Sequence, residues 1–464
     1  MTLKGKHVLV LGLGESGLAM ALWLARVGAR LTVADSRATP PGVAELDKGA
    51  PGAIKVFGPF ADSLLDGVDL LALSPGLSPN EAVVVEARAR GIPVTGEIEL
   101  FAQALRDLGL RDKTKIIAIT GTNGKTTTTT LVGEMCRAAG LLTAVAGNIS
   151  PAALTALMAC LDAGKNPDAW VLELSSFQLE TLESLAPEAA TVLNVSDDHL
   201  DRHGDLDGYA QVKARIFMGH GVQVLNRQDA RVMAMGRPGQ SVMRFGLDAP
   251  TGANDFGLVE REGGPWLVCG NELLLPVADM PLAGLHNAAN ALAGLALCSA
   301  IGLPMAPLLS ALKNFKGLSH RVEWVADLGG VAFFDDSKGT NVGATVAALE
   351  GLGRKVAVIL GGDGKGQDFS PLKDVVAKHA RFVALIGRDA PLIEAALAGC
   401  GVPTVRCEDM GAAVLAASAA AQKGDAVLLS PACASMDMYR NYAHRAEVFV
   451  AAVRSLADQR ECGR

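Results

Sequence analysis

The chain has 464 residues, of which 50% are hydrophobic and 20% are charged, and this composition excludes a disordered protein. Its net charge of −7 argues against general affinity for nucleic acid. No apolar run approaches the ~20 residues that cross a bilayer, so we expect no membrane insertion.

Eight cysteines are scattered along the chain without a single C-x-x-C pair. Their spacing argues against a zinc site, and a chain of this size needs no disulfide framework. We therefore expect the protein to work in the cytoplasm.

At ~150 residues per domain, the length predicts about three domains. Three times along the chain, a short apolar strand leads into a new α/β segment. The predicted strands at these starts are 6–13, 115–120 and 331–335. Helices that end near residues 27 and 139 follow the first two, and the third is followed by strands at 356–360, 382–386 and 426–429. This alternation predicts parallel sheets with helices on both faces.

Polar stretches at 106–114 and 316–320 mark candidate domain boundaries. We expect an α/β fold of three domains, each with a mostly parallel sheet, at residues 1–112, 113–318 and 319–464. Between residues 226 and 280 the pattern alternates more, which predicts some antiparallel strands. Because ligands bind beyond the carboxyl ends of parallel strands, the turns at those ends are candidates for chemistry.

The first strand leads into residues 12–17, Gly-Leu-Gly-Glu-Ser-Gly, which match the G-x-G-x-x-G dinucleotide fingerprint. Asp35 ends the next strand, where it could bind a ribose hydroxyl. Taken alone, the pair indicates a nicotinamide-dependent oxidoreductase. The fingerprint itself specifies only a diphosphate at a helix N-terminus, so another nucleotide diphosphate fits as well. Residues 74–76, Ser-Pro-Gly, either line the same crevice or form a simple turn.

The strand that begins at residue 115 runs into 121–127, Gly-Thr-Asn-Gly-Lys-Thr-Thr, which opens a helix. Glycines let backbone N–H groups converge on phosphate oxygens, Lys125 can neutralise them, and the Thr126 hydroxyl can ligate Mg²⁺. Ile119 stands where the full G-x-x-x-x-G-K-[ST] pattern has its first glycine. The alternative is a Gly-rich turn with a solvated lysine, and the strand before and helix after favour phosphate binding.

Acidic and histidine side chains follow the neighbouring strands. Glu173 ends an apolar run, where an acid is costly unless it is paired or bound to metal. A solvated edge position is the alternative. The strand at 190–195 runs into 196–203, whose charges we interpret mostly as a helix N-cap with surface groups. His199 is the exception, expected as a metal ligand or substrate contact. Lys213, by its helical position alone, would be a solvated lysine.

Three turns in the C-terminal third each follow an apolar strand and carry small residues together with hydroxyl, Lys or Asp groups. They are 335–341, 361–365 and 430–437. One such turn needs no function, but three on one sheet edge indicate a binding face.

Together these motifs resemble the Mur ligases of peptidoglycan synthesis, over essentially the whole chain. The most specific stretches are GEIELF at 96–101, LELSSFQ at 172–178, DSKGTN at 336–341 and SPACAS at 430–435. The phosphate loop fits every Mur ligase and folylpolyglutamate synthetase. The last two stretches select the D-glutamate-adding members. Gly339 and Tyr442 stand where the family pattern more often has Ala and Phe.

The resemblance implies a Rossmann-like N-terminal domain for the UDP-substrate and a P-loop ATPase-like central domain. It implies a Rossmann-like C-terminal domain that binds D-glutamate and closes over ATP. The implied reaction transfers the ATP γ-phosphate to the carboxylate of UDP-N-acetylmuramoyl-L-alanine, and the D-glutamate amine then attacks the acyl phosphate. The implied protein is a monomer that uses ATP and Mg²⁺ and carries a CO₂-derived carbamate on Lys213.

The residue roles implied by the resemblance follow the motifs. ATP contacts would come from Gly121, Thr122, Asn123, Gly124, Lys125, Thr126, Thr127, Asn287, Asn290, Arg321 and Asp336. The metal would be bound by Thr126, Glu173, His199 and carbamylated Lys213, and the catalytic residues would be Lys125, Glu173, His199 and Lys213. The UDP-substrate would contact Ser16, Asp35, Ser36, Arg37, Ser74 and Asn148. The remaining substrate contacts, mostly to D-glutamate, would be Lys338, Thr340, Lys365, Ser435 and Tyr442.

Three other hypotheses remain open from the sequence. A nicotinamide-dependent oxidoreductase would leave the phosphate loop and the C-terminal turns unexplained. A different ATP-dependent amide ligase would act on folate or on another amino acid. A catalytically dead nucleotide-binding module is disfavoured because Lys125, Thr126, Glu173 and Lys213 are all present.

Overall fold

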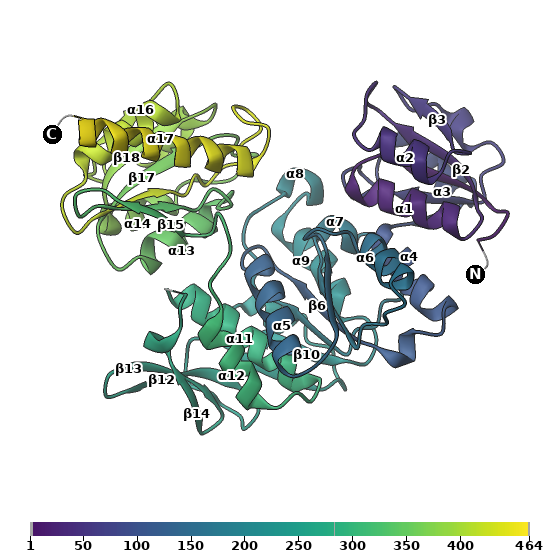
Figure 1. Cartoon of the computed structure of the whole chain (residues 1–464), viewed down its shortest axis with the longest axis horizontal. Coiled ribbons are helices and arrows are strands. Elements are labelled where there is room, and N and C mark those ends of the chain that lie inside the picture. The colour runs from purple at the N-terminus through teal and green to yellow at the C-terminus, as the bar shows by residue number, and fades with distance from the viewer. Residues whose placement is uncertain (1–2, 283, 463–464) are drawn as a thin grey trace.

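A computed structural model describes residues 3–282 and 284–462 of the chain. Three α/β domains follow one another along the chain, and Figure 1 shows the central domain between the N-terminal domain and the C-terminal domain. Each domain is built on its own sheet, of five, nine and six strands in chain order. The predicted fold class is therefore confirmed, including the mostly parallel pairing within each sheet.

The N-terminal sheet is entirely parallel, with strand order β3-β2-β1-β4-β5. Alternate residues of β1 face opposite layers, because successive side chains of a strand point to opposite faces. Val8 and Val10 pack towards α1, whereas Leu9 and Leu11 pack towards α3. The elements are β1 (His7–Leu11), α1 (Glu15–Arg26), β2 (Arg30–Asp35), α2 (Val43–Gly49), β3 (Ile54–Phe57), β4 (Leu70–Leu73), α3 (Ala82–Ala89) and β5 (Val94–Thr95).

The central sheet has the order β14-β13-β12-β11-β10-β9-β6-β8-β7. Its strands β6 to β11 are parallel, whereas β12, β13 and β14 form the antiparallel pairs predicted between residues 226 and 280. The strands are β6 (Lys115–Thr120), β7 (Thr143–Gly147), β8 (Ala169–Glu173), β9 (Ala189–Val192), β10 (Val222–Asn226), β11 (Val242–Phe245), β12 (Phe256–Arg261), β13 (Gly264–Cys269) and β14 (Glu272–Pro276).

Helices cover both faces of the central sheet. Ile117 and Ile119 of β6 pack in the layer of α5 and α11, and Ile116 and Ala118 pack in the opposite layer with α6. The strand that carries the phosphate loop is therefore held rigidly from both sides. The helices are α5 (Lys125–Ala138), α6 (Ala153–Asp162), α7 (Ser176–Leu179), α8 (Leu200–His203), α9 (Leu206–Ala214), α10 (Ala230–Ala234), α11 (Leu285–Ala300) and α12 (Met305–Asn314).

The C-terminal sheet has the order β15-β16-β20-β17-β18-β19, and only β15 runs antiparallel to its neighbour. The elements are β15 (Glu323–Asp327), β16 (Ala332–Asp335), α13 (Val342–Gly351), β17 (Val356–Gly361), α14 (Leu372–His379), β18 (Ala380–Ile386), α15 (Ala390–Ala396), β19 (Thr404–Arg406), α16 (Met410–Ala420), β20 (Ala426–Leu429) and α17 (Tyr442–Cys462).

Helix α4 (Glu97–Asp107) joins the first two domains. Its Phe101 ring meets the Trp170 ring of β8 edge to face, with centroids 4.9 Å apart. Glu97, at the start of α4, accepts a hydrogen bond from the Leu154 N–H of α6, and Glu15 of α1 accepts one from the Ser150 hydroxyl. One apolar cluster runs through both domains, so they share a core.

Within the part of the chain that the structure describes, no helix is both long enough and apolar enough to pass through a membrane.

Candidate active site

The phosphate loop connects β6, in the middle of the central sheet, to α5. Gly121 and Gly124 adopt φ values of +154° and +82°, which disfavour residues with a side chain. Neighbouring backbone holds the loop open, because the Thr122 N–H donates to the Asn194 carbonyl at 2.9 Å. The Asn123 N–H donates to the Asn194 side chain at 2.8 Å. The loop therefore has the shape of an anion site before any ligand binds.

Lys125 opens α5 and folds back over the loop. Its Nζ donates to the carbonyls of Gly121 and Thr122, at 2.9 and 2.8 Å. Burial lowers the pKa of the Lys125 ammonium, and the carboxylates of Glu173 and Asp198 oppose this effect. The cation is poised where phosphate oxygens would replace the carbonyls as its partners.

Glu173, at the end of β8, is 2% exposed. Its Oε1 accepts a 2.7 Å hydrogen bond from the Asn148 side chain. Its Oε2 is buried and has no hydrogen-bond partner among the described residues. A buried carboxylate oxygen without a partner is costly, so the solvated-edge alternative for Glu173 is wrong, and the free oxygen fits a cation ligand.

His199 caps α8 with a left-handed backbone, at φ +54°. Burial lowers the pKa of its imidazole to about 4, with Lys365 and Lys125 lowering it further and Asp198 opposing. The ring is therefore neutral at pH 7, which is the form that ligates metal ions. By the chemistry of their donor atoms, oxygen of Glu173 and Thr126 and nitrogen of His199, these residues suit the predicted metal site, which stays a prediction.

Lys213 of α9 is 1% exposed, so the interpretation of a solvated helical lysine is wrong. Its Nζ donates to the Gly121 carbonyl at 2.9 Å and lies 4.3 Å from the centre of the Tyr209 ring. Burial and the nearby Lys125 hold the pKa of the Lys213 amine well below its usual range. The chain thus places two lysines on one carbonyl of the phosphate loop.

Only some of the charged residues at 196–203 lie on the protein surface. Asp197 and Asp201 are exposed, as expected. The surface interpretation is wrong for Asp198 and His203, whose side chains are 13% and 3% exposed. Asp198 lies 3.9 Å from Lys365 of the C-terminal domain, so tertiary partners, invisible in the local pattern, bury it. The predicted side-chain N-cap is also absent, because His199 caps α8 without a side-chain hydrogen bond.

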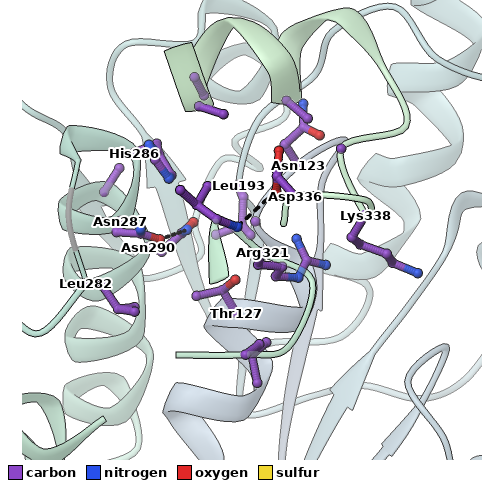
Figure 2. A pocket seen from close by; sticks show the side chains of 18 of the residues that line it. Asn123, Thr127, Leu193, Leu282, His286, Asn287, Asn290, Arg321, Asp336 and Lys338 are labelled. Atoms are coloured by element: carbon purple, nitrogen blue, oxygen red, sulfur yellow. Dashed lines mark hydrogen bonds between the residues drawn. The ribbon is translucent and has the colours of Figure 1, made fainter. Parts of the chain in front are cut away.

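A cavity of about 160 Å³ lies between the central and C-terminal domains. Figure 2 shows Asn287 and Asn290 of α11 on one side and Arg321, Asp336 and Lys338 on the other. Asn290 packs against the phosphate loop so closely that a methyl group on Gly124 would lie 2.3 Å from its Oδ1. The predicted nucleotide contacts therefore gather around one pocket beside the loop.

The C-terminal domain touches the phosphate loop directly. The Arg321 guanidinium donates to the Thr126 hydroxyl at 2.8 Å, and the Asn341 amide donates to the Asn123 side chain at 3.0 Å. These contacts bring a cation and the start of α13 over the phosphate loop.

The three C-terminal turns form a single face, as expected. The Ser430 hydroxyl donates to Asp336 at 2.6 Å, and Asp363 pairs with Ala434 through backbone hydrogen bonds of 2.9 and 2.8 Å. Lys338 points its ammonium at the Tyr442 ring, 3.7 Å from the centroid. Burial lowers the pKa of Lys338 to about 8, and the cations Arg321, Lys125 and Lys365 lower it further.

The remaining predicted D-glutamate contacts lie on or beside these turns. Ser435, in the turn at 430–437, is 4% exposed. Thr340 lies in the turn at 335–341 and is half-buried.

The fingerprint turn of the N-terminal domain lies at the end of β1. A methyl group on Gly17 would lie 1.8 Å from the Gly12 carbonyl oxygen, so only glycine allows this approach of α1. Asp35 accepts hydrogen bonds from the Leu13 N–H at 2.7 Å and from the Arg37 guanidinium at 2.8 and 2.7 Å. These bonds hold the pKa of Asp35 at about 2. Both oxygens of Asp35 thus have partners within the protein, and its contact with the substrate stays a prediction.

Ser36 and Arg37 are exposed beyond β2. Ser74 is buried against Gly12, and Ser16 lies in the first turn of α1. Asn148 stands apart from these residues, because it lies in the central domain on Glu173. The predicted UDP-substrate contacts therefore extend from the N-terminal fingerprint towards the predicted metal site.

We predict that Gly17→Ala destabilises the protein by about 1–3 kcal/mol or more, because the new methyl group collides with backbone that cannot move aside. The change is measured as a lower urea midpoint of unfolding. Gly14→Ala is the matched control, since a methyl group there meets nothing within 4 Å. Equal stability of the two variants would contradict the prediction.

Several residues of the site were not predicted from the sequence. Leu193, Phe245 and His286 line the pocket beside the phosphate loop, and the Lys213 ammonium lies over the Tyr209 ring. Arg445, fully buried, donates to the carbonyls of Ser337 and Cys433 at 2.8 and 3.0 Å. Its guanidinium thereby joins two of the C-terminal turns. The available signal for Arg445 was its place one helical turn after Tyr442.

Comparison of sequences finds three domains of one family in order along the chain. The Mur ligase MurD-like N-terminal domain matches residues 6–96, the Mur ligase middle domain matches residues 119–298, and the Mur ligase glutamate ligase domain matches residues 320–433.

Relatives match over nearly their whole length. A UDP-N-acetylmuramoylalanine–D-glutamate ligase of Aromatoleum aromaticum is 63% identical over 462 residues, covering 99% of each chain. A ligase of the same name from Dechloromonas aromatica is 57% identical over 457 residues, covering 98% of this chain and 100% of its own.

Solved structures with low sequence identity share the fold. The UDP-N-acetylmuramate-alanine ligase MurC of Thermotoga maritima superposes with a TM-score of 0.58 at 20% identity, over 97% of this chain and 99% of its own. MurF of Acinetobacter baumannii gives a TM-score of 0.57 at 17% identity, over 93% of this chain and 88% of its own.

Proposed function

The chain belongs to the Mur ligase family, and on that premise we propose that it is an ATP-dependent ligase that joins D-glutamate to UDP-N-acetylmuramoyl-L-alanine. The observation that carries most weight is the phosphate loop at the start of α5, with Lys125 folded over it and Arg321 and Asn341 reaching it from the C-terminal domain. A loop covered in this way suits transfer of a phosphoryl group away from water.

Phosphoryl transfer here requires positioning and charge neutralisation. The N–H groups at the start of α5 and the Lys125 ammonium would hold the ATP phosphates, and Arg321 with Lys338 and Lys365 would supply further positive charge. The γ-phosphate passes to the carboxylate of the L-alanyl group and ADP leaves. The carboxylate, whose oxide is a poor leaving group, thereby becomes an acyl phosphate. The D-glutamate amine then attacks the carbonyl carbon, phosphate leaves, and an amide forms.

Thr126, Glu173 and His199 would hold Mg²⁺, for which the unpartnered Glu173 oxygen and the neutral His199 ring are suitable ligands. When bound, the metal neutralises charge on the phosphates and on the transferring group. Burial holds the pKa of the Lys213 amine beside the loop well below its usual range, which favours the uncharged amine, the only form that adds to CO₂. Its carbamate would place a negative charge where the bare lysine offers none.

The substrates occupy the outer domains in this proposal. Ser16, Asp35, Ser36 and Arg37 would hold the uridine diphosphate end, and Asp35 also orients Arg37. The C-terminal turns would hold D-glutamate through Lys365, Thr340, Ser435 and Tyr442. We propose domain limits of 1–112, 113–318 and 319–464, a cytoplasmic location and a monomeric state.

We predict that phosphate release from ATP and Mg²⁺ requires both UDP-N-acetylmuramoyl-L-alanine and D-glutamate, with L-glutamate inert. The assay omits one component at a time and counts phosphate against the amide product. Turnover with a folate substrate or another amino acid would identify a different amide ligase instead. Quenching of NADH fluorescence on titration would favour the oxidoreductase, and absence of turnover with every acceptor would favour a dead nucleotide-binding module.

A further inference from the structure

Arg202 of α8 connects the central domain to the substrate loop of the N-terminal domain. Its Nη2 donates to the Leu77 carbonyl at 2.7 Å. Leu77 lies three residues after Ser74, in the loop that follows β4 and packs against Gly12 of the fingerprint. Figure 1 shows α8 at the edge of the central domain, between the two outer domains. One side chain thus reaches from beside the predicted metal site to the predicted UDP-substrate site.

The same guanidinium ties together the two segments that carry the metal-ligand candidates. It donates to both carboxylate oxygens of Glu180, at 3.1 and 2.6 Å, and Glu180 follows α7, which begins three residues after Glu173. Arg202 itself lies three residues after His199. The fork of Arg202 therefore fixes the spacing of α7 and α8.

Phe177 of α7 completes the connection. Arg202 lies over its ring at 4.9 Å from the centroid, and the His199 ring meets the same ring edge to face with centroids 4.8 Å apart. A displacement of Arg202 would therefore move the Phe177 ring and, through it, the His199 ring. Helix α8, which contains Arg202 and is capped by His199, provides a second connection between the two residues.

The ion pair of Arg202 and Glu180 is more buried than the ion pairs on the protein surface. The side chains of Arg202 and Glu180 are 14% and 11% exposed. Arg231 and Asp207 form a comparable pair of the same domain, but their side chains are 48% and 78% exposed. Water screens the attraction between exposed charges, so an exposed ion pair constrains its side chains only weakly. A buried bidentate pair between arginine and a carboxylate keeps a defined geometry.

We propose that Arg202 is a positioning residue that couples the loop of the UDP-substrate to the loops of Glu173 and His199. This inference rests on the proposed function. When the bound UDP-substrate fixes the position of Leu77 and its loop, Arg202 stabilises the arrangement of α7 and α8 that favours binding of Mg²⁺ and ATP. By thermodynamic linkage, nucleotide binding then tightens binding of the UDP-substrate by the same factor.

The test is equilibrium binding of UDP-N-acetylmuramoyl-L-alanine, with and without Mg²⁺ and a non-hydrolysable ATP analogue. We expect the nucleotide to tighten substrate binding about tenfold in the unaltered protein, within the usual range of coupling. In Arg202→Met, which keeps the length of the side chain without its donors, this factor falls to about one. Arg231→Met is the matched control and keeps the tenfold factor.

Two further measurements separate coupling from general damage. Arg202→Lys preserves the charge but not the fork, so it should fold even where Arg202→Met does not, and it should lose most of the coupling. Thermal unfolding reports on each variant. A coupling factor that is unchanged in Arg202→Met, or in Arg202→Lys if only that variant folds, overturns the inference. So does the absence of coupling in the unaltered protein. Failure of the proposed function is separate, because it appears as missing D-glutamate-dependent turnover in the unaltered protein.

Discussion

Lys125→Ala is expected to lower kcat on the order of a thousandfold or more, because it removes the cation that we propose faces the β- and γ-phosphates in the phosphate loop. In the folded protein its ammonium already sits on the carbonyls of Gly121 and Thr122, held in place before the substrate arrives. Such preorganised charge stabilises the transition state without moving at the moment of reaction. The rate constant is measured by phosphate release at saturating substrates.

The control for this change lies on the same strand. Lys115, at the start of β6, is exposed and lies at the opposite end of the strand from the loop. Lys115→Ala should therefore leave kcat within about twofold of the unaltered protein, as surface changes distant from a site usually do. Retention of phosphate release in Lys125→Ala, with ATP bound at its normal affinity, would contradict the assignment of this loop to the triphosphate.

The strands and the turns that follow them could be predicted from the sequence because their signals are local. β6 and its loop follow from an apolar run and a glycine pattern. The three C-terminal turns could be assigned to one edge of their sheet, because each turn follows a strand and the carboxyl ends of parallel strands meet at the same edge. Even the antiparallel strands β12 to β14 could be recognised, because alternation of polar and apolar residues is itself a local pattern.

Contacts between domains could not be predicted in this way. Asp198 was expected on the surface, yet it is largely buried and faces Lys365, which lies far along the chain. Lys213 was interpreted, from helical position alone, as solvated, and its burial depends on the packing of α9 under the phosphate loop. Arg445 lies one helical turn after Tyr442, but the pattern of its helix does not show that its guanidinium joins two of the C-terminal turns. In each case the cause is a neighbour that the local sequence does not contain.

Lys213→Ala is expected to reduce turnover on the order of a hundredfold or more, with partial rescue by formate or acetate. The cavity left by the lysine can admit a short carboxylic acid, which would supply the negative charge that a carbamate provides. Rescue should saturate with acid concentration and should be absent for Lys125→Ala, whose lost group is a cation. Full activity of Lys213→Ala would refute the carbamate, and loss without rescue by any short acid would favour a structural role for the lysine.

Lys213→Met should also make the ligand-free protein more stable at pH 7, even though it is inactive. Burial holds the pKa of the Lys213 amine in the folded state well below 10.5, the ordinary value that applies in the unfolded chain. Folding therefore releases a proton, and below pH 10.5 this release costs free energy that grows as the pH falls towards the lowered pKa. The free energy of unfolding should thus rise with pH, with a smaller slope in Lys213→Met than in the unaltered protein. Urea unfolding in CO₂-free buffer between pH 6.5 and 9 measures both slopes, with Lys115→Met as the exposed control. Identical slopes would mean that Lys213 keeps its proton in the fold and cannot add to CO₂.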